Sequence, residues 1–99
     1  MVRFAIVLGL ALAGAAPVAA ASKAESCNYQ AQVVAAVQNA RLQKVKERKV
    51  QAHVEANATW PAEYNTAIPL VTPWVYEMKM KDVRNQNLGQ AWQELCLQQ

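Results

Sequence analysis

The 99-residue chain is poor in the side chains on which most metal and redox sites depend. It contains one histidine, His53, and two cysteines, Cys27 and Cys96, which lie near opposite ends of residues 22–99. A zinc site needs several Cys or His ligands, and redox cysteines are usually close in sequence, as in C-x-x-C. We therefore predict no metal site and no cofactor, and we do not expect the two cysteines to be a redox pair.

Glycine and paired carboxylates are equally scarce. Beyond residue 21 the only glycine is Gly89, so no Gly-rich loop is available to bind phosphate groups. The acidic residues are scattered, and their spacing indicates no acid pair of the kind that glycosidases use. The scattered carboxylates include Glu63, Glu77, Asp82 and Glu94. We predict no catalytic residue and no enzymatic activity, with a small hydrolase or a thiol oxidoreductase as the least favoured function.

No apolar run in the chain is long enough to span a membrane, and the longest one lies at the N-terminus. Arg3 precedes an apolar run from Phe4 to Ala13, and mostly small residues follow up to Ala21. This run has about ten residues, whereas a membrane-spanning helix needs about 20. We interpret residues 1–21 as a signal peptide, cleaved after Ala20 or Ala21. The prediction is a periplasmic or secreted protein with one domain, residues 22–99, and no membrane span after cleavage.

The two cysteines are available for one intramolecular disulfide. An exported protein folds in an oxidising compartment, where a single Cys pair has one possible intramolecular pairing. A domain of about 78 residues has only a modest core, so a covalent link contributes a large share of its stability. Closing a loop of about 70 residues stabilises a fold by roughly 4 kcal/mol. We expect Cys27 and Cys96 to form a structural disulfide.

The composition and the apolar spacing of residues 22–99 predict an all-α fold, a small bundle of about four helices. Ala, Gln, Glu, Lys and Leu dominate, and no segment alternates apolar and polar residues over the length of a strand. The first helix is predicted to begin at the N-cap residue Ser26 and to run to about Val45. The apolar positions then change phase, which indicates a break near 45–48 and a short second helix over 47–57.

The third helix carries the clearest apolar stripe in the chain. Pro69 and Pro73 lie off this stripe, which predicts one helix kinked at the prolines. The alternative is two shorter helices, the second capped by Thr72 with Pro73 in its first position. The stripe consists of Tyr64, Ala67, Ile68, Val71, Trp74, Val75 and Met78.

The remaining segments predict a polar connection and a last helix. Residues 79–86 are mostly polar and are interpreted as the end of the third helix and a loop. Asn87, followed by Gln90 three residues later, predicts an N-cap with a capping box, and Cys96 lies on the apolar face of the helix that follows. Five aromatic residues are expected to form the centre of the core, namely Trp60, Trp74, Trp92, Tyr64 and Tyr76.

A basic segment lies where the first helix is expected to end. Five basic residues occur within nine positions, with only Glu47 as an acid among them: Arg41, Lys44, Lys46, Arg48 and Lys49. Such a cluster is either a solvated helix face or a contact surface for an anionic partner, such as lipid headgroups or a cell-wall polymer. Nucleic acid is not expected as a partner outside the cytoplasm. Arg41 also falls within the apolar stripe of the first helix, where Glu77 or Glu94 is the expected counter-ion.

Several short motifs spread over residues 27–96 are similar to those of a known class of proteins. They are Cys27-Asn28-Tyr29-Gln30-Ala31-Gln32, Ala40-Arg41-Leu42, Trp60-Pro61, Ile68-Pro69-Leu70-Val71, Trp74-Val75-Tyr76-Glu77, Leu88-Gly89, Trp92 and Cys96. Through them the chain resembles small exported helical proteins of alphaproteobacteria. The resemblance implies a periplasmic helical domain with its terminal cysteines joined, and it implies no activity and no catalytic residues.

These observations lead to one main hypothesis and one alternative. The main hypothesis is a non-catalytic, exported binding or structural module, whose partner is an envelope protein or an anionic envelope component. Its basis is the absence of a catalytic pattern together with a disulfide and a basic segment. The alternative is a holdase-type envelope stress chaperone, which would expose its apolar stripe when the fold is loosened.

Overall fold

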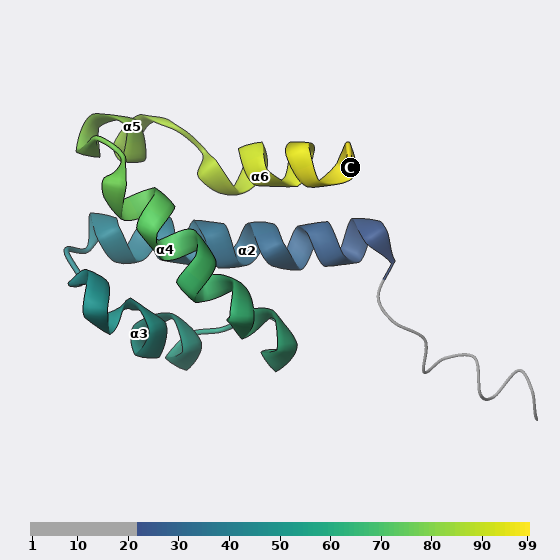
Figure 1. Ribbon diagram of the computed structural model, residues 1–99, viewed down its shortest axis with the longest axis horizontal. Coiled ribbons are helices and arrows are strands. Elements are labelled where there is room, and N and C mark those ends of the chain that lie inside the picture. The colour runs from purple at the N-terminus through teal and green to yellow at the C-terminus, as the bar shows by residue number, and fades with distance from the viewer. Residues whose placement is uncertain (1–21) are drawn as a thin grey trace, which may run out of the picture.

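A computed structural model describes residues 22–99, and the predicted signal peptide lies outside the described residues. The described part contains five α-helices, two short 3-10 helices and no strand (Figure 1). The helices are α2 (Lys23–Leu42), η2 (Glu47–Lys49), α3 (Val50–Ala56), η3 (Ala62–Ala67), α4 (Ile68–Glu77), α5 (Met80–Asn85) and α6 (Leu88–Leu97). The predicted all-α fold is confirmed, with one short helix more than expected.

The 20-residue helix α2 is the centre of the fold, and α3, α4, α5 and α6 all contact it. Figure 1 shows α6 antiparallel beside the N-terminal half of α2, with α3 on the other side of α2 and α4 crossing α2 toward α5. Helix α2 begins at Lys23, so the predicted N-cap at Ser26 is wrong. The N-cap is Ser22, whose hydroxyl accepts from the Glu25 N–H at 3.1 Å while the Glu25 carboxylate accepts from the Ser22 N–H at 3.2 Å. This reciprocal capping box satisfies two otherwise unpaired N–H groups.

The break after α2 is confirmed, and it is made by a lysine in a conformation that usually requires glycine. Lys44 has a positive φ of 64°. The Lys44 N–H donates to the Arg41 carbonyl and the Val45 N–H donates to the Ala40 carbonyl, each at 2.9 Å. These two bonds form a Schellman motif, which ends the helix at Leu42 rather than at the expected Val45. The predicted short second helix corresponds to η2 followed by α3.

The third predicted helix is one continuous helical segment. The 3-10 helix η3 passes directly into α4 just before Pro69, which lies in the first turn of α4, where a missing N–H removes no helical hydrogen bond. Pro73 alone lies inside the helix. Thr72 does not cap a new helix, since its hydroxyl donates to the Ile68 carbonyl at 2.7 Å from within α4. The alternative of two helices split at Thr72 is therefore wrong.

The loop predicted for residues 79–86 is also wrong, because α5 occupies most of it. Val83 is fully buried, and the Gln38 side chain on α2 holds both ends of the connection to α6. Its amide N–H groups donate to the carbonyls of Val83 and Gln86, each at 2.7 Å, and its amide oxygen accepts from the Leu88 N–H at 3.3 Å. The capping of α6 is confirmed in part. Asn87 accepts from the Gln90 N–H at 3.0 Å, but Gln90 meets the Asn87 side chain instead of its backbone.

The core is built from β-branched and leucine side chains, not from the aromatic residues that were expected at its centre. Its fully buried members include Val33, Val34, Val37, Val50, Val54, Ile68, Val75 and Leu88. Among the aromatics only Trp60 is buried, with 8% exposure, whereas Trp74 remains 40% exposed and Tyr64, Tyr76 and Trp92 are partly buried. Partial burial lets ring edges reach polar partners, as the Trp92 indole N–H does at the Gln30 amide oxygen, 3.0 Å away.

Gly89 permits the close approach of α6 to α2, and we expect Gly89→Ala to destabilise the protein by about 1–3 kcal/mol. A Cβ atom at this position would lie 2.9 Å from the Ala31 carbonyl oxygen and 3.3 Å from the Ala35 Cβ. Helix propensity alone favours alanine over glycine by about 1 kcal/mol, so a loss of stability identifies the steric cause. Urea unfolding measures it, with Ala91→Gly on the exposed side of α6 as the control that loses propensity alone. A stabilised Gly89→Ala variant would contradict the close contact.

Candidate functional site

The Cys27–Cys96 disulfide joins the first and last helices, as predicted. The two Cα atoms are 5.6 Å apart, and the chain between the cysteines has a sequence separation of 69. Cys27 is buried with 1% exposure, and the Trp92 indole one turn before Cys96 donates to the Gln30 amide oxygen at 3.0 Å. The bond lies within the packing between α2 and α6, as expected of a structural disulfide.

Arg41 points inward and does not belong to the exposed basic surface. Its guanidinium donates to the carbonyls of Val75 and Met78 at the C-terminal end of α4, with 2.6 Å to Met78, and it lies 5.6 Å from the centre of the Tyr76 ring. The expected counter-ion, Glu77 or Glu94, is therefore wrong. The partial negative charge of a helix C-terminus supplies the compensation instead.

Tyr76 adds a second link between the same segments. Its hydroxyl donates to the Val45 carbonyl at 2.6 Å, which ties α4 to the turn that follows α2. Burial raises the pKa of the Tyr76 hydroxyl above its ordinary value of 10.0, while the charge of Arg41 acts in the opposite direction. The hydroxyl thus remains protonated at neutral pH, and this contribution to stability is lost only as the pH rises above about 10.

The other four residues of the predicted basic segment are exposed, and the fold brings the segment that carries three more to the same end of the molecule. Lys44, Lys46, Arg48 and Lys49 line one open surface hollow together with the half-buried His53. The turn between α4 and α5 lies at the same end of the molecule in Figure 1, held there by the contacts of Arg41 and Tyr76. We call the resulting surface the basic pole, defined as Lys44, Lys46, Arg48, Lys49, Lys79, Lys81 and Arg84.

Charge is distributed unevenly between this end and the rest of the domain. With Arg41, the end carries eight basic side chains less three acidic ones, Glu47, Glu77 and Asp82, which gives a formal charge of +5. The rest of residues 22–99 has one basic and four acidic side chains, a formal charge of −3. These are Lys23, Glu25, Glu55, Glu63 and Glu94. Sequence reasoning found the first basic segment and missed the second, because Lys79, Lys81 and Arg84 join it only through the packing of α4 and α5 against α2.

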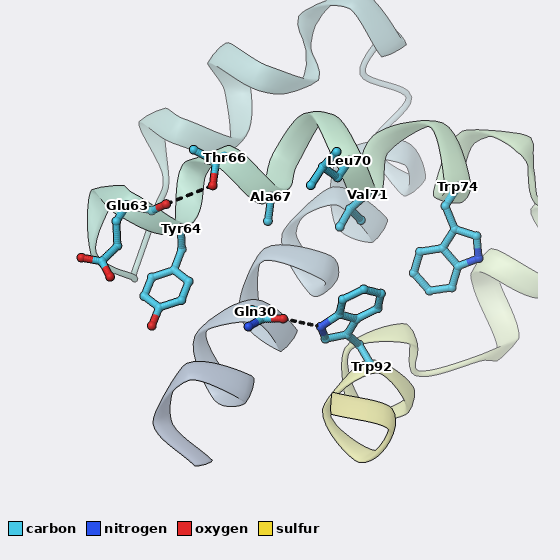
Figure 2. Close-up of a pocket in the computed structure, with 9 residues that line it drawn as sticks. All are labelled: Gln30, Glu63, Tyr64, Thr66, Ala67, Leu70, Val71, Trp74 and Trp92. Carbon is cyan, nitrogen blue, oxygen red and sulfur yellow. Dashed lines mark hydrogen bonds between the residues drawn. The ribbon is translucent and has the colours of Figure 1, made fainter. Parts of the chain in front are cut away.

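A second surface feature lies between α4 and α6, away from the basic pole. We call it the aromatic groove, defined by Glu63, Tyr64, Leu70 and Trp74 on the η3–α4 segment and by Gln30 and Trp92 on α2 and α6. Its volume is about 430 Å³. Figure 2 shows Trp74 and Trp92 at one end and Glu63 with Tyr64 at the other. Sequence reasoning missed this groove, because it assigned both tryptophans to the core.

Residues 22–99 were also compared with the requirements of a metal site and of a membrane span. No group of three or more His, Cys, Asp or Glu side chains between residues 22 and 99 is arranged to hold a metal ion. Over the same residues no helix has both the length and the apolar character needed to cross a bilayer. Comparisons with protein-family models, with curated proteins and with solved structures found no match to the chain. The resemblance noted in the sequence therefore stays a prediction.

Proposed function

We propose that the protein is a non-catalytic binding module of the cell envelope, which attaches to an anionic component through the basic pole. One observation carries this proposal. The fold brings seven exposed basic side chains from two separate chain segments to one end of the molecule. Each Lys or Arg side chain near a surface of anionic phospholipid headgroups contributes about 1 kcal/mol to the free energy of binding. A periplasmic protein meets such surfaces at the membranes that enclose it.

The charge balance favours a binding surface over an ordinary solvated helix face. Surface charges of both signs are usually interspersed, which leaves little net field. Here a formal charge of +5 at one end faces −3 over the rest of the domain. Such a distribution orients the molecule in the field of an anionic surface, with the basic pole toward the surface.

The holdase alternative depends on a different part of the molecule. A holdase would act by releasing apolar side chains such as Ile68, Val71 and Val75 from the α4 stripe. These side chains are buried in the folded, disulfide-bonded protein. The exposed basic pole therefore supports the stronger proposal.

Binding to lipid vesicles of defined charge tests the proposal. Residues 22–99 should sediment with phosphatidylcholine vesicles that contain phosphatidylglycerol, and not with pure phosphatidylcholine, and added salt should weaken the interaction. The variants Lys44→Gln/Lys46→Gln and Lys79→Gln/Lys81→Gln each remove two positive charges from the pole. Each is expected to weaken binding by about 30-fold, because two basic residues contribute about 2 kcal/mol.

The matched control removes the same net charge at the other end of the molecule. Lys23→Gln/Gln98→Glu also lowers the charge by two, at exposed positions near the ends of α2 and α6. It should bind the vesicles almost as well as the wild type. Equal losses in all three variants would show that net charge alone matters, and no loss in the Lys79→Gln/Lys81→Gln variant would remove the second segment from the site. Either result would contradict the proposal.

A further inference from the structure

We propose that the aromatic groove is a binding site for a small organic cation with an apolar body, such as an alkylammonium compound. The argument is independent of the basic pole, because the groove lies between α4 and α6 and contains none of its residues. It rests on the size of the groove, on the exposure of its apolar lining and on the sign of its charge.

The size of the groove suits a small molecule. Its volume of about 430 Å³ lies within the range of about 300–1,000 Å³ that is typical of small-ligand sites. In Figure 2, Ala67 at the end of η3 and Leu70 and Val71 on α4 lie between Trp74 on one side and Glu63 with Tyr64 on the other, and Trp92 faces them from α6. The lining therefore has an aromatic end and a carboxylate end, joined by an aliphatic stretch. An elongated ligand with an apolar body and a charged head matches this arrangement.

The apolar lining is unusually exposed for a domain with so few large side chains. Leu70 is 78% exposed and Trp74 is 40% exposed, while the core of the domain is filled mainly by valines. The rings of Trp74 and Trp92 are tilted by 47° with their centroids 6.2 Å apart. A ligand that covered Leu70 and the two indoles would remove this apolar surface from water, which is the main source of affinity in such sites.

The charge of the groove selects a cation. Glu63 is its only charged lining residue, and the seven basic residues of the basic pole do not line it. Aromatic ring faces attract cations through their quadrupole, and tryptophan does so most strongly. An anionic head group would meet the Glu63 carboxylate at one end of the groove, or the electron-rich faces of Trp74 and Trp92 at the other.

Two hydrogen-bond donors of the lining are used within the protein. The Trp92 indole N–H donates to the Gln30 amide oxygen at 3.0 Å, and the Thr66 hydroxyl donates to the Glu63 carbonyl at 3.2 Å (Figure 2). These two donors are therefore not offered to an anionic ligand.

A matched series of eight-carbon compounds tests the inference. Octyltrimethylammonium, 1-octanol and octanoate have the same apolar chain and differ in the charge of the head group. Calorimetry gives their dissociation constants, and the fluorescence of the two groove tryptophans reports where they bind. We expect saturable binding of the cation, about tenfold tighter than that of octanoate, with octanol between them.

Two variants connect this preference to the groove. Glu63→Gln removes the carboxylate and should reduce the affinity for the cation to about that for octanol, while Glu55→Gln, an exposed glutamate on α3, should leave it unchanged. Trp74→Leu should weaken binding of the cation and abolish most of the fluorescence response. Far-UV circular dichroism confirms that each variant is folded. Equal affinities for the three compounds, a preference for octanoate, or an unchanged Glu63→Gln variant would each overturn the inference.

Discussion

Replacement of both Cys27 and Cys96 by serine is expected to lower the free energy of unfolding by about 4 kcal/mol. The disulfide closes nearly the whole domain, with a sequence separation of 69 between the cysteines, and thereby restricts the unfolded chain. Domains of this size have total stabilities of about 5–15 kcal/mol, so the loss is a large fraction of the whole. Urea unfolding followed by far-UV circular dichroism measures it.

Reduction of the wild type supplies the control for this experiment. The reduced protein should unfold at the same urea concentration as the double serine variant, because both lack only the cross-link. The dependence of the unfolding free energy on urea should also be steeper without the disulfide, since the unlinked chain exposes more surface when it unfolds. Coincident curves for oxidised and reduced protein would contradict the structural role assigned to the bond.

Arg41→Met is expected to destabilise the protein by about 3 kcal/mol, although it removes only one polar group. The guanidinium donates to the carbonyls of Val75 and Met78, and hydrogen bonds to a charged group contribute about 1.5–3 kcal/mol each. Methionine keeps much of the apolar stem and its packing, so the loss reports mainly on the polar head. Thermal or urea unfolding gives the size of the effect.

Arg48→Met, at an exposed position in η2, is the matched control and should change stability by less than about 0.5 kcal/mol. Arg41→Lys should fall between the two, because a single ammonium group replaces the planar fork of donors. Since Arg41 faces inward, Arg41→Met should bind anionic vesicles like the wild type wherever it is folded. A variant as stable as the wild type would refute the role of Arg41 as an anchor.

Arg41 and Gln38 act in the same way on two short helices. Helices α4 and α5 have ten and six residues and no side-chain N-cap, so neither is expected to be stable alone. Long polar side chains on α2 donate to carbonyls at the C-terminal ends of both helices. Helix α2 thus supplies hydrogen-bond donors to the ends of two short helices.

The two proposed binding surfaces lie apart and carry opposite charge. The basic pole lies at the end where α2, α4 and α5 terminate, and the aromatic groove lies over the N-terminal half of α2 beside α6. Binding at one surface leaves the other accessible. The two proposals together describe a protein that rests on an anionic surface and presents the groove to solution.

The sequence alone determined the features that depend on neighbouring residues. The helical class, the break after the first helix, the cap at Asn87 and the pairing of two lone cysteines follow from local spacing, from capping chemistry and from the small number of possible pairings. The tertiary structure alone decided α5, the inward position of Arg41, the valine core and the two surface sites. Helical periodicity shows that Trp74 and Trp92 lie on apolar faces, but it does not show how much of each face a partner helix covers. That coverage depends on the lengths and crossing of helices far apart in the chain, and so does the position of the α4–α5 turn at the same end of the molecule as the C-terminus of α2.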